Sequence, residues 1–353
     1  MCAQEGSVKS RNVFLFLLVA LLATAPMCFA QPRGISYPNI PITADPKPLF
    51  LTHAPDVAQA DYTFMRIDPP GGTHCYVDAH AINNARMVVV VWTDDCVSYT
   101  THAWLWNSGK WTSLDWVDRK CPDTGTQFES LTNNGIAFGL YWSISCNYQP
   151  AAGLDAKSGR WFVLPNPHGF KFNAGISLSE NGRATGSASN SIYYETLTHW
   201  IWDGSRYFFP TFPADWDVSA FWAGPEFINN AGQIGGQFVD KAKGLMRGYF
   251  QDGSRTTTFD APGNPTGGTF VNGLTNAGDV LLIGNYDQTS PYYPARSFLW
   301  RHGLFTPLPN VPFPEAAWTA VFGVNERGDL TGRWGDAYGG WHVFVAYRNA
   351  PEK

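Results

Sequence analysis

The sequence predicts an all-β protein, a six-bladed β-propeller of four-stranded antiparallel blades in which an N-terminal strand completes the last blade. Three observations lead to this prediction: a turn signal that recurs six times, four strand-like segments in most repeats, and a repeat-ending element that stands before the first repeat. The composition agrees, because 15 Trp, 15 Tyr and 24 Phe beside 35 Gly and 25 Pro are typical of an all-β chain with many turns.

The recurring turn follows an apolar run and precedes a second strand. Asn and Gly are frequent in it because both residues accept positive φ at low cost. The six segments are AINNARMVVV, LTNNGIAFGL, LSENGRATGS, INNAGQIGGQ, LTNAGDVLLI and VNERGDLTGR. Their turn positions are Arg86, Gly135, Gly182, Gly232, Gly278 and Gly328, at intervals of 49, 47, 50, 46 and 50 residues. A repeat of this length is typical of a propeller blade.

Each turn is followed by a third segment with apolar alternation, and in five repeats by a fourth. The third segments are THAWLWN, AAGLDAK, THWIWDG, RGYFQDG, SFLWRHG and HVFVAYR, and the fourth are WTSLD, RWFVLP, YFFPTF, TTTFDAP and LFTPLP. The sixth repeat reaches the end of the chain without a fourth strand. The sequence therefore leaves the last blade one strand short.

The segment YTFMRID (62–68) supplies the missing strand. Asp68 lies 18 residues before Arg86, just as Asp260, which ends the fourth strand TTTFD, lies 18 residues before Gly278. We expect this segment to pair antiparallel with the third strand of the sixth blade, around 341–347, and to close the ring without an unpaired edge. The alternative is an extra unpaired strand in a linear solenoid.

The N-terminal sixty residues differ from the repeats. Residues 1–30 carry basic residues, an apolar run and small residues up to Ala30, the pattern of a cleaved signal peptide; a signal anchor is the alternative. Residues 31–60 are Pro-rich and aperiodic and predict a linker or surface arm, which leaves 61–353 for the propeller. We therefore expect a secreted or periplasmic protein without stable membrane insertion after cleavage.

The charge excludes one class of partner. After removal of residues 1–30 the chain has 22 basic and 28 acidic residues, a formal charge of −6. Nucleic-acid binders instead carry a basic surface. No phosphate-binding Gly-rich loop and no calcium-loop spacing occurs in the sequence, so we expect neither a cofactor nor a metal site.

The repeats resemble the extracellular repeats named for a His-Ala-Phe (HAF) motif. The resemblance rests on AINNARMVVVVWTDDCVSYTTHAWLWNSGKWTSLD and on the IDPPGG and FDAPGN pieces, and it covers about 62–348. Arg86 replaces the turn Gly, and only His102, His199 and His342 keep the motif His. The resemblance implies secretion and a propeller-like fold, and it implies no defined activity.

The four cysteines of the mature chain predict disulfides, as expected for an exported protein. Cys75 and Cys121 enter first strands, whereas Cys96 and Cys146 follow second strands, so all four belong to one face of the first two blades. We expect the pairs Cys75–Cys96 and Cys121–Cys146, each within a blade. The alternative is a bond between blades, such as Cys96–Cys121.

Catalytic machinery is not evident from the sequence. The three motif histidines recur at equivalent places in different blades, so we expect them to bind loops to their own blades. His168, in PNPHGF, lies outside the motif and is a better site candidate. No Gly-x-Ser-x-Gly elbow occurs. The acids Glu129, Glu226 and Glu315 lie in or before first strands, where a glycosidase pair is one interpretation and solvated loop acids are the other.

The segments ADWDVSAFWAGPE, NSIYYETL, NYDQTSPYYPAR and RWGDAYGGWH are unusually aromatic. Exposed Trp and Tyr beside polar residues suit stacking on sugar rings or contact with a peptide. The predicted ligand-binding residues are Trp216, Trp222, Tyr292, Tyr293, Trp334 and Tyr338. The alternative is that these aromatic residues fill the spaces between blades.

These observations predict a secreted propeller that acts as a binding or interaction module for a glycan or peptide, with carbohydrate as the favoured ligand. The alternatives are a propeller glycoside hydrolase or polysaccharide lyase, and a structural envelope protein. Charged residues that converge on the channel would favour an enzyme, whereas aromatic residues with few charges would favour a binding module.

Overall fold

The computed structural model describes residues 61–71, 76–93, 100–121, 123–192, 196–219, 223–263, 268–286 and 296–349, together with the backbone of three short strands between 39 and 53. The segment expected to be a signal peptide lies outside the described residues. Within these ranges the regular structure is β-strand, and no helix is long and apolar enough to cross a membrane.

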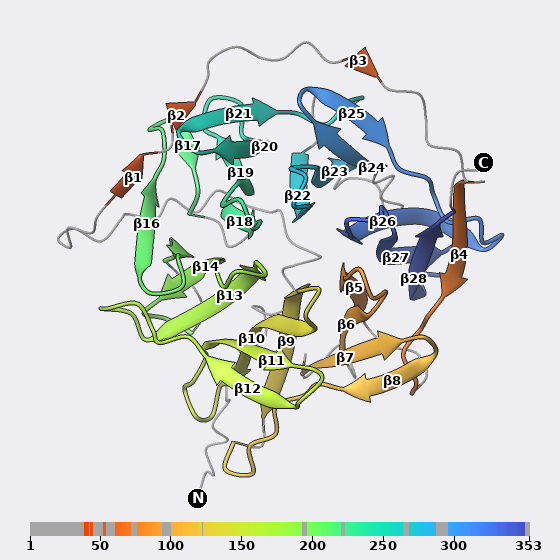
Figure 1. Cartoon of the computed structure of the whole chain (residues 1–353), viewed down its shortest axis with the longest axis horizontal. Helices are drawn as coiled ribbons and strands as arrows, with labels where there is room; N and C mark the ends of the chain where they lie inside the picture. Colours follow the sequence, from red (N-terminus) through yellow and green to blue (C-terminus); the bar gives the residue numbers. More distant parts are fainter. Residues whose placement is uncertain are drawn as a thin grey trace, which may run out of the picture.

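The strands form six antiparallel sheets arranged as a ring of blades (Figure 1). Blade 1 comprises β5 (Tyr76–Ile82), β6 (Val88–Thr93), β7 (Thr101–Asn107) and β8 (Lys110–Ser113). Blade 2 comprises β9 (Thr124–Leu131), β10 (Ile136–Ser143), β11 (Ala151–Asp155) and β12 (Arg160–Val163). Blade 3 comprises β13 (Phe172–Leu178), β14 (Ala184–Ser189), β15 (Thr198–Trp202) and β16 (Tyr207–Thr211).

The second half of the chain repeats this order. Blade 4 comprises β18 (Gly224–Ile228), β19 (Ile234–Asp240), β20 (Leu245–Asp252) and β21 (Arg255–Phe259), with the short β17 (Trp216–Asp217) also paired to β19. Blade 5 comprises β22 (Gly268–Leu274), β23 (Val280–Tyr286), β24 (Arg296–Arg301) and β25 (Leu304–Pro307). Blade 6 comprises β26 (Ala316–Val324), β27 (Leu330–Asp336), β28 (Trp341–Arg348) and β4 (Tyr62–Arg66). The six-bladed prediction is confirmed.

The closure prediction is also confirmed. The N-terminal strand β4 pairs antiparallel with β28, in a register that joins Tyr62 to Arg348 and Arg66 to Phe344. Asp68, which follows β4, accepts a hydrogen bond from the backbone N–H of Val343 at 2.9 Å and lies 2.9 Å from Nδ1 of His342. The repeat-ending Asp therefore binds the chain end of the last blade to its outer strand.

Hydrophobic cores lie between neighbouring blades. Val89 and Val91 of blade 1 pack with Phe128 and Ala137 of blade 2. The last junction is built alike, because Val343 and Val345 of blade 6 belong to the core that contains the buried valines of β5 and β6. Each blade is therefore buried on both faces, which is why its strands are almost continuously apolar.

A closed set of hydrogen bonds, which we call the turn ring, joins all six blades at the β-turns between first and second strands. At each junction a backbone N–H donates to a side-chain oxygen on the next blade. The series runs from Asn84 to Asn133, Glu180, Asn230, Asn276, Glu326 and back to Asn84. The measured distances lie between 2.7 and 3.1 Å at five junctions. The recurring Asn therefore connects blades, besides shaping its own turn.

The structure shows what Arg86 does at the turn position where the other five repeats have Gly. It adopts φ 62°, in the left-handed region that glycine occupies in the other five turns. Its guanidinium donates to the buried Asp329 of blade 6 at 3.1 Å and lies 4.2 Å from the ring centroid of Tyr347. The side chain of this residue in the left-handed region therefore links the first blade to the last.

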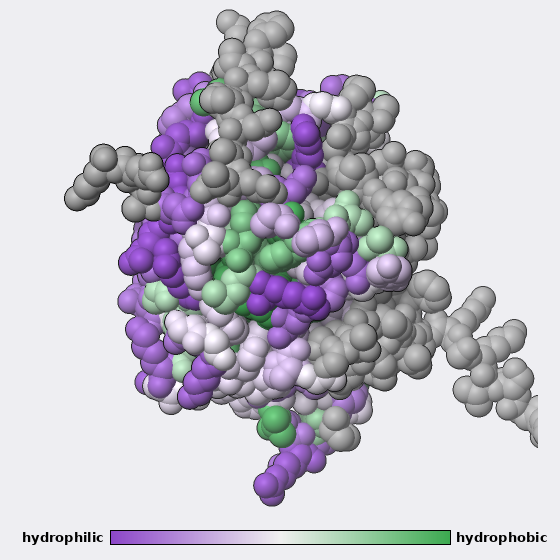
Figure 2. All heavy atoms as spheres, turned by 90° about the vertical axis from the view of Figure 1, so that its right-hand side faces the viewer, coloured by the Kyte–Doolittle hydropathy of each residue, from purple (hydrophilic) through white to green (hydrophobic). Residues whose placement is uncertain are grey.

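The Pro-rich segment contributes three short strands at the rim of the molecule (Figure 1). The strand β1 (Asn39–Pro41) pairs parallel with β16, β2 (Thr43–Ala44) with β21, and β3 (Thr52–His53) with β25. The segment thus follows the outer edges of blades 3, 4 and 5. A side view onto β4 and β28 shows a largely hydrophilic described surface with hydrophobic residues gathered near its middle (Figure 2).

Two deletions test the closure. Removal of residues 62–68 should cause aggregation or a large loss of thermal stability, because it exposes the edge of β28 and removes the main-chain bridge between blade 6 and blade 1. Removal of residues 31–55 should be milder, since every blade keeps its four strands. Melting temperature and light scattering measure both effects. Equal tolerance of the two deletions would contradict closure through β4.

The buried amides beside the turn ring give a second prediction. Asn325 donates from Nδ2 to the backbone oxygen of Asn83 at 2.9 Å, across the junction of the last and first blades. Asn325→Ala should lower the free energy of unfolding by about 1–3 kcal/mol, since buried partners are left unsatisfied. Asn107→Ala, at an exposed hairpin, is the control. Similar chemical denaturation curves for the two variants would contradict a stabilising role at this junction.

Candidate functional site

Every first strand contains a β-bulge, and the six bulged residues surround the axis of the ring. The register skips one residue at the same place in each blade. The skipped residues are His80, Glu129, Ile176, Glu226, Asn272 and Phe322, each six positions before its turn residue. We call this set the bulge ring. A bulge redirects a side chain from the sheet plane, so this position carries chemistry without altering the blade.

The axis of the ring contains a cavity of about 110 Å³. Its walls come from all six first strands and from the turn ring, and His80, Glu129, Asn272 and Phe322 of the bulge ring line it. Since one water needs roughly 10–15 Å³, the cavity has room for several waters or one small polar molecule.

His80 and Glu129 form an ion pair in the wall of this cavity. Nδ1 of His80 lies 2.5 Å from Oε2 of Glu129, and the imidazole is buried and stacked on Phe322 with 6.2 Å between ring centroids. Burial lowers the pKa of His80, but the charge of Glu129 outweighs it and the pKa is raised. Burial raises the pKa of Glu129, but the His80 charge and hydrogen bonds from His80 and Gln127 lower it overall. Each group therefore favours the charged form of the other.

The pKa of Glu226 is shifted in the opposite direction to that of Glu129. Glu226 is buried, and its Oε1 has no hydrogen-bond partner within the part of the chain that the structure describes. Burial, reinforced by the charge of Glu129, raises the pKa of Glu226 well above its ordinary value. The neighbouring Tyr249 is affected in turn, since burial and then the charge of Glu226 raise its pKa. Its surroundings therefore favour the protonated form of Glu226.

Two buried polar atoms in the cavity wall lack partners among the described residues. They are Nε2 of His80 and Nδ2 of Asn272. Unpaired buried polar groups are rare in folded proteins and require an explanation. The two atoms come from blades 1 and 5, so two different sides of the channel contribute polar groups.

A second layer orients His80. Asp78 Oδ2 lies 3.8 Å from Nε2 of His80 and accepts a hydrogen bond from Tyr76. Arg333 of blade 6 lies 3.0 Å from Oδ1 of Asp78, and its guanidinium stands 4.4 Å from the ring centroid of Trp341. The series Arg333, Asp78, His80 and Glu129 thus alternates in charge from the last blade through the first to the second.

The motif histidines bind loops to their own blades, as expected. His102 lies 2.9 Å from Asp115, and His342 lies 2.9 Å from Asp68. His199 donates from Nε2 to the backbone oxygen of Val218 at 2.7 Å, and burial lowers its pKa to about 4. None of the three lines the cavity.

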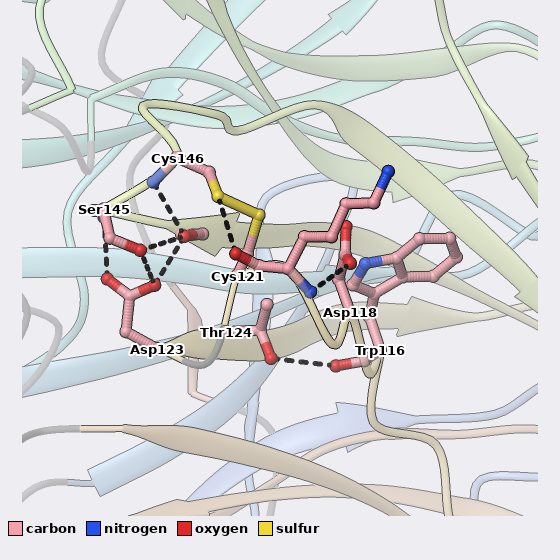
Figure 3. Close-up of a disulfide and its surroundings, with 9 residues drawn as sticks. Trp116, Asp118, Cys121, Asp123, Thr124, Ser145 and Cys146 are labelled. Atoms are coloured by element: carbon pink, nitrogen blue, oxygen red, sulfur yellow. Dashed lines mark hydrogen bonds between the residues drawn. A yellow bond between two sulfur atoms is a disulfide. The ribbon is translucent and has the colours of Figure 1, made fainter.

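One expected disulfide is present, between Cys121 and Cys146 of blade 2, with 5.8 Å between Cα atoms (Figure 3). This pairing is incompatible with the alternative bond Cys96–Cys121. Asp123 accepts hydrogen bonds from Ser143 and Ser145 beside the disulfide; desolvation opposes their effect, but together they lower the pKa of Asp123 to about 2. Cys75 and Cys96 lie outside the described residues, so their pairing stays a prediction.

The predicted ligand-binding aromatics do not gather into one described surface. Trp216 is buried and stacked on Phe238, with 3.7 Å between ring centroids, and Trp334 is fully buried in the core between blades 5 and 6. Both side chains fill space between blades, as the alternative interpretation expected. Tyr338 is 95% exposed at a turn between β27 and β28. Trp222, Tyr292 and Tyr293 lie outside the described residues.

The other candidate residues separate into two groups. Glu129 and Glu226 belong to the bulge ring, whereas Glu315 is exposed and lies 3.7 Å from Arg66 at the rim. His168 is exposed in a turn after β12 and does not line the cavity. The sequence analysis missed His80 and Asn272, although a fixed signal was available: both stand six residues before their turn positions, as Glu129 and Glu226 do.

Comparison with known proteins supports no family assignment. No protein-family model matches the sequence, and curated proteins give no match. Among solved structures, a gluconolactonase of Xanthomonas campestris aligns with TM-score 0.46 and 12% identity over 91% of this chain and 100% of its own. A Dyadobacter fermentans protein of unknown function aligns with TM-score 0.49 and 10% identity over 83% and 99%. The propeller domain of a Pyrococcus furiosus protease aligns with TM-score 0.42 and 10% identity, over 78% of this chain and 100% of its own. At this distance none of them informs the function.

The raised pKa of Glu226 gives a pH prediction. Because its pKa is raised in the fold, the folded chain keeps a proton that the unfolded chain releases above about pH 4.5, so this group makes stability fall as pH rises. The free energy of unfolding of the Glu226→Gln variant should therefore rise relative to that of wild type by up to about 1.4 kcal/mol per pH unit above that point. Denaturant unfolding at several pH values measures the difference, with Glu315→Gln as control. A difference independent of pH would mean that Glu226 is ionised in the fold.

Proposed function

We propose that the protein is a propeller binding module whose ligand, a polyhydroxylated molecule such as a sugar residue, enters the axial cavity. The observation that supports the proposal is the set of buried polar groups in the cavity wall: the unpaired atoms of His80 and Asn272 and the Glu129 carboxylate beside them. These atoms include amide hydrogens, an imidazole nitrogen and a carboxyl oxygen. A hydroxyl group both donates and accepts hydrogen bonds, so a polyol matches this mixed set better than an anion or an apolar ligand.

The walls of the cavity agree with such a ligand. Phe227 and Phe322 supply apolar surface, while amides and carboxylates of the turn ring, such as Asn230 and Glu180, lie toward one end of the cavity. Small-molecule sites commonly combine apolar lining with a few placed polar groups. The size of the cavity suits one sugar ring or a chain end rather than a long polymer lying across the blade faces.

The cellular setting belongs to the proposal as well. The Cys121–Cys146 disulfide and the leader-like first thirty residues support an exported protein, since disulfides persist in oxidising compartments. The HAF resemblance points the same way. We propose a secreted or periplasmic module without a resident cofactor, which meets glycans outside the cytoplasm.

A binding experiment distinguishes the channel from the aromatic loops. The purified mature protein is screened on a glycan array and the hits are measured by calorimetry. Asn272→Leu keeps the side-chain size and removes the buried donor, and it should weaken binding about tenfold, the equivalent of about 1.4 kcal/mol. Tyr338→Ala, on the exposed turn, should leave affinity unchanged. Loss of binding in Tyr338→Ala with full binding in Asn272→Leu would move the site to the loops and overturn the channel proposal.

A further inference from the structure

We infer that the sugar bound in the axial cavity carries a free amino group, and that the carboxylates of Glu180 and Glu326 hold its ammonium at the mouth of the cavity. This inference rests on the proposed function, since it names the class of sugar that the cavity would take. It goes further because it assigns a charged contact to two members of the turn ring, whose hydrogen bonds otherwise join the blades.

The lining of the cavity is acidic. Among the described residues that line it, Glu129, Glu180 and Glu326 carry carboxylates, the imidazole of His80 is the one basic group, and neither Lys nor Arg contributes. Glu129 already has His80 as its partner at 2.5 Å. Neither Glu180 nor Glu326 forms an ion pair with another described residue. Two carboxylates without a cationic partner therefore remain in the lining.

The hydrogen bonds of the turn ring do not require these two charges. In four blades the acceptor is the side-chain amide oxygen of an Asn, and in blades 3 and 6 it is a carboxylate oxygen of Glu180 or Glu326. The amide oxygen of Asn230 accepts at 2.9 Å and the carboxylate of Glu326 at 2.7 Å. Glu180 also accepts from Nδ2 of Asn134 at 2.9 Å, a neutral donor that leaves its charge in place. The negative charge is thus additional to what the fold needs.

The two carboxylates stand on opposite sides of the mouth. The turn ring is a cycle through the six blades, in which Glu180 belongs to blade 3 and Glu326 to blade 6. Glu180 is partly exposed and Glu326 is exposed, so a ligand that enters from solvent meets both. An ammonium group has a compact charge and donor hydrogens that point in several directions. It therefore suits acceptors on opposite sides, and it offsets two like charges at once.

The inner level of the cavity suits the uncharged part of the sugar. The side chain of His80 is only 7% exposed, lines the cavity, and has an Nε2 without a hydrogen-bond partner among the described residues. This buried group is a sign of a polar ligand that is independent of the acidic mouth. Each bulge-ring residue stands four positions before the turn-ring residue of its blade. At about 3.3 Å per residue the two levels are therefore at most roughly 13 Å apart, so one chain end can face both.

Two other charged ligands fit the cavity less well. An anionic sugar would meet the same carboxylates with no Lys or Arg among the described lining residues to bind it. A metal ion needs several ligands placed together, as the six to eight oxygens around Ca²⁺ show. In the part of the chain that the structure describes, no group of three or more His, Cys, Asp or Glu is placed to hold one. The Asn oxygens of the turn ring already accept backbone hydrogen bonds.

The test compares three oligosaccharides of equal length by calorimetry with the mature protein: a glucosamine oligomer with free amines, its N-acetylated form, and a uronate oligomer. At a pH where the amine is charged, the free-amine oligomer should bind at least about tenfold more tightly than the N-acetylated form, as expected for hydrogen bonds to charged groups. A rise from about 50 to about 500 mM NaCl should weaken binding of the free-amine oligomer and leave that of the N-acetylated form unchanged. This measurement needs no variant.

Variants locate the amine. Glu180→Gln and Glu326→Gln each keep an oxygen that can accept in the turn ring. Each should weaken binding of the free-amine oligomer about tenfold and leave binding of the N-acetylated form unchanged. Glu315→Gln removes an exposed acid at the rim, outside the cavity lining, and should match wild type for both oligomers. Calcium chloride is titrated alone into wild type and Glu326→Gln, and no saturable heat is expected.

The outcomes separate the two proposals. Equal affinity for the free-amine and N-acetylated oligomers, or tightest binding of the uronate, overturns the inference and leaves the binding module in place. A preference for the amine that survives in both Glu180→Gln and Glu326→Gln overturns it as well, because the amine then lies elsewhere. Calcium binding that is lost in Glu326→Gln would assign the mouth to a metal ion instead. Failure of these oligomers and of every glycan on the array to bind overturns the proposed function itself.

Discussion

Closure of the ring is the constraint on which the rest of the structure depends. Six blades surround an axis only if the last sheet meets the first as closely as any other neighbours. Three kinds of contact achieve this junction: backbone pairing of β4 with β28, the buried core shared by Val343 and the valines of blade 1, and the Arg86–Asp329 ion pair. If the junction between blade 6 and blade 1 opens and β4 separates from β28, the edge of β28 is exposed. The stability of the whole ring therefore depends on this junction.

The same closure creates the site. The turn ring holds the first strands around the axis. Four of the bulged side chains, from His80 to Phe322 and thus up to 242 residues apart, therefore line one channel. The backbone of the channel is nearly symmetric, whereas the side chains are not. The fold therefore has one position per blade, the bulged residue, at which different side chains occur within the same strand pairing.

The sequence predicted the number of blades and the closing strand because both depend on spacing, which turns and strand lengths fix locally. It did not predict the site, because the bulge ring has no common residue type: only the offset of six residues from the turn is shared. Trp334 shows a related limit. The sequence predicts it as an exposed ligand-binding residue, yet it stands six residues after Gly328, as Trp92 does after Arg86, and its side chain is buried in the second strand of its blade.

The contrast between the two rings is the strongest argument that the channel has a ligand. At the turn ring every blade uses Asn or Glu, since each must accept the same hydrogen bond, and a structural task repeated six times gives a repeated residue. At the bulge ring the residue differs from blade to blade: a hydrogen-bonded His–Glu pair in blades 1 and 2, a buried acid without a partner in blade 4, and an amide in blade 5. Buried Glu226 without a partner costs stability whenever the pH favours its ionised form. The proposed axial ligand rests on this contrast between a symmetric scaffold and an asymmetric set of side chains.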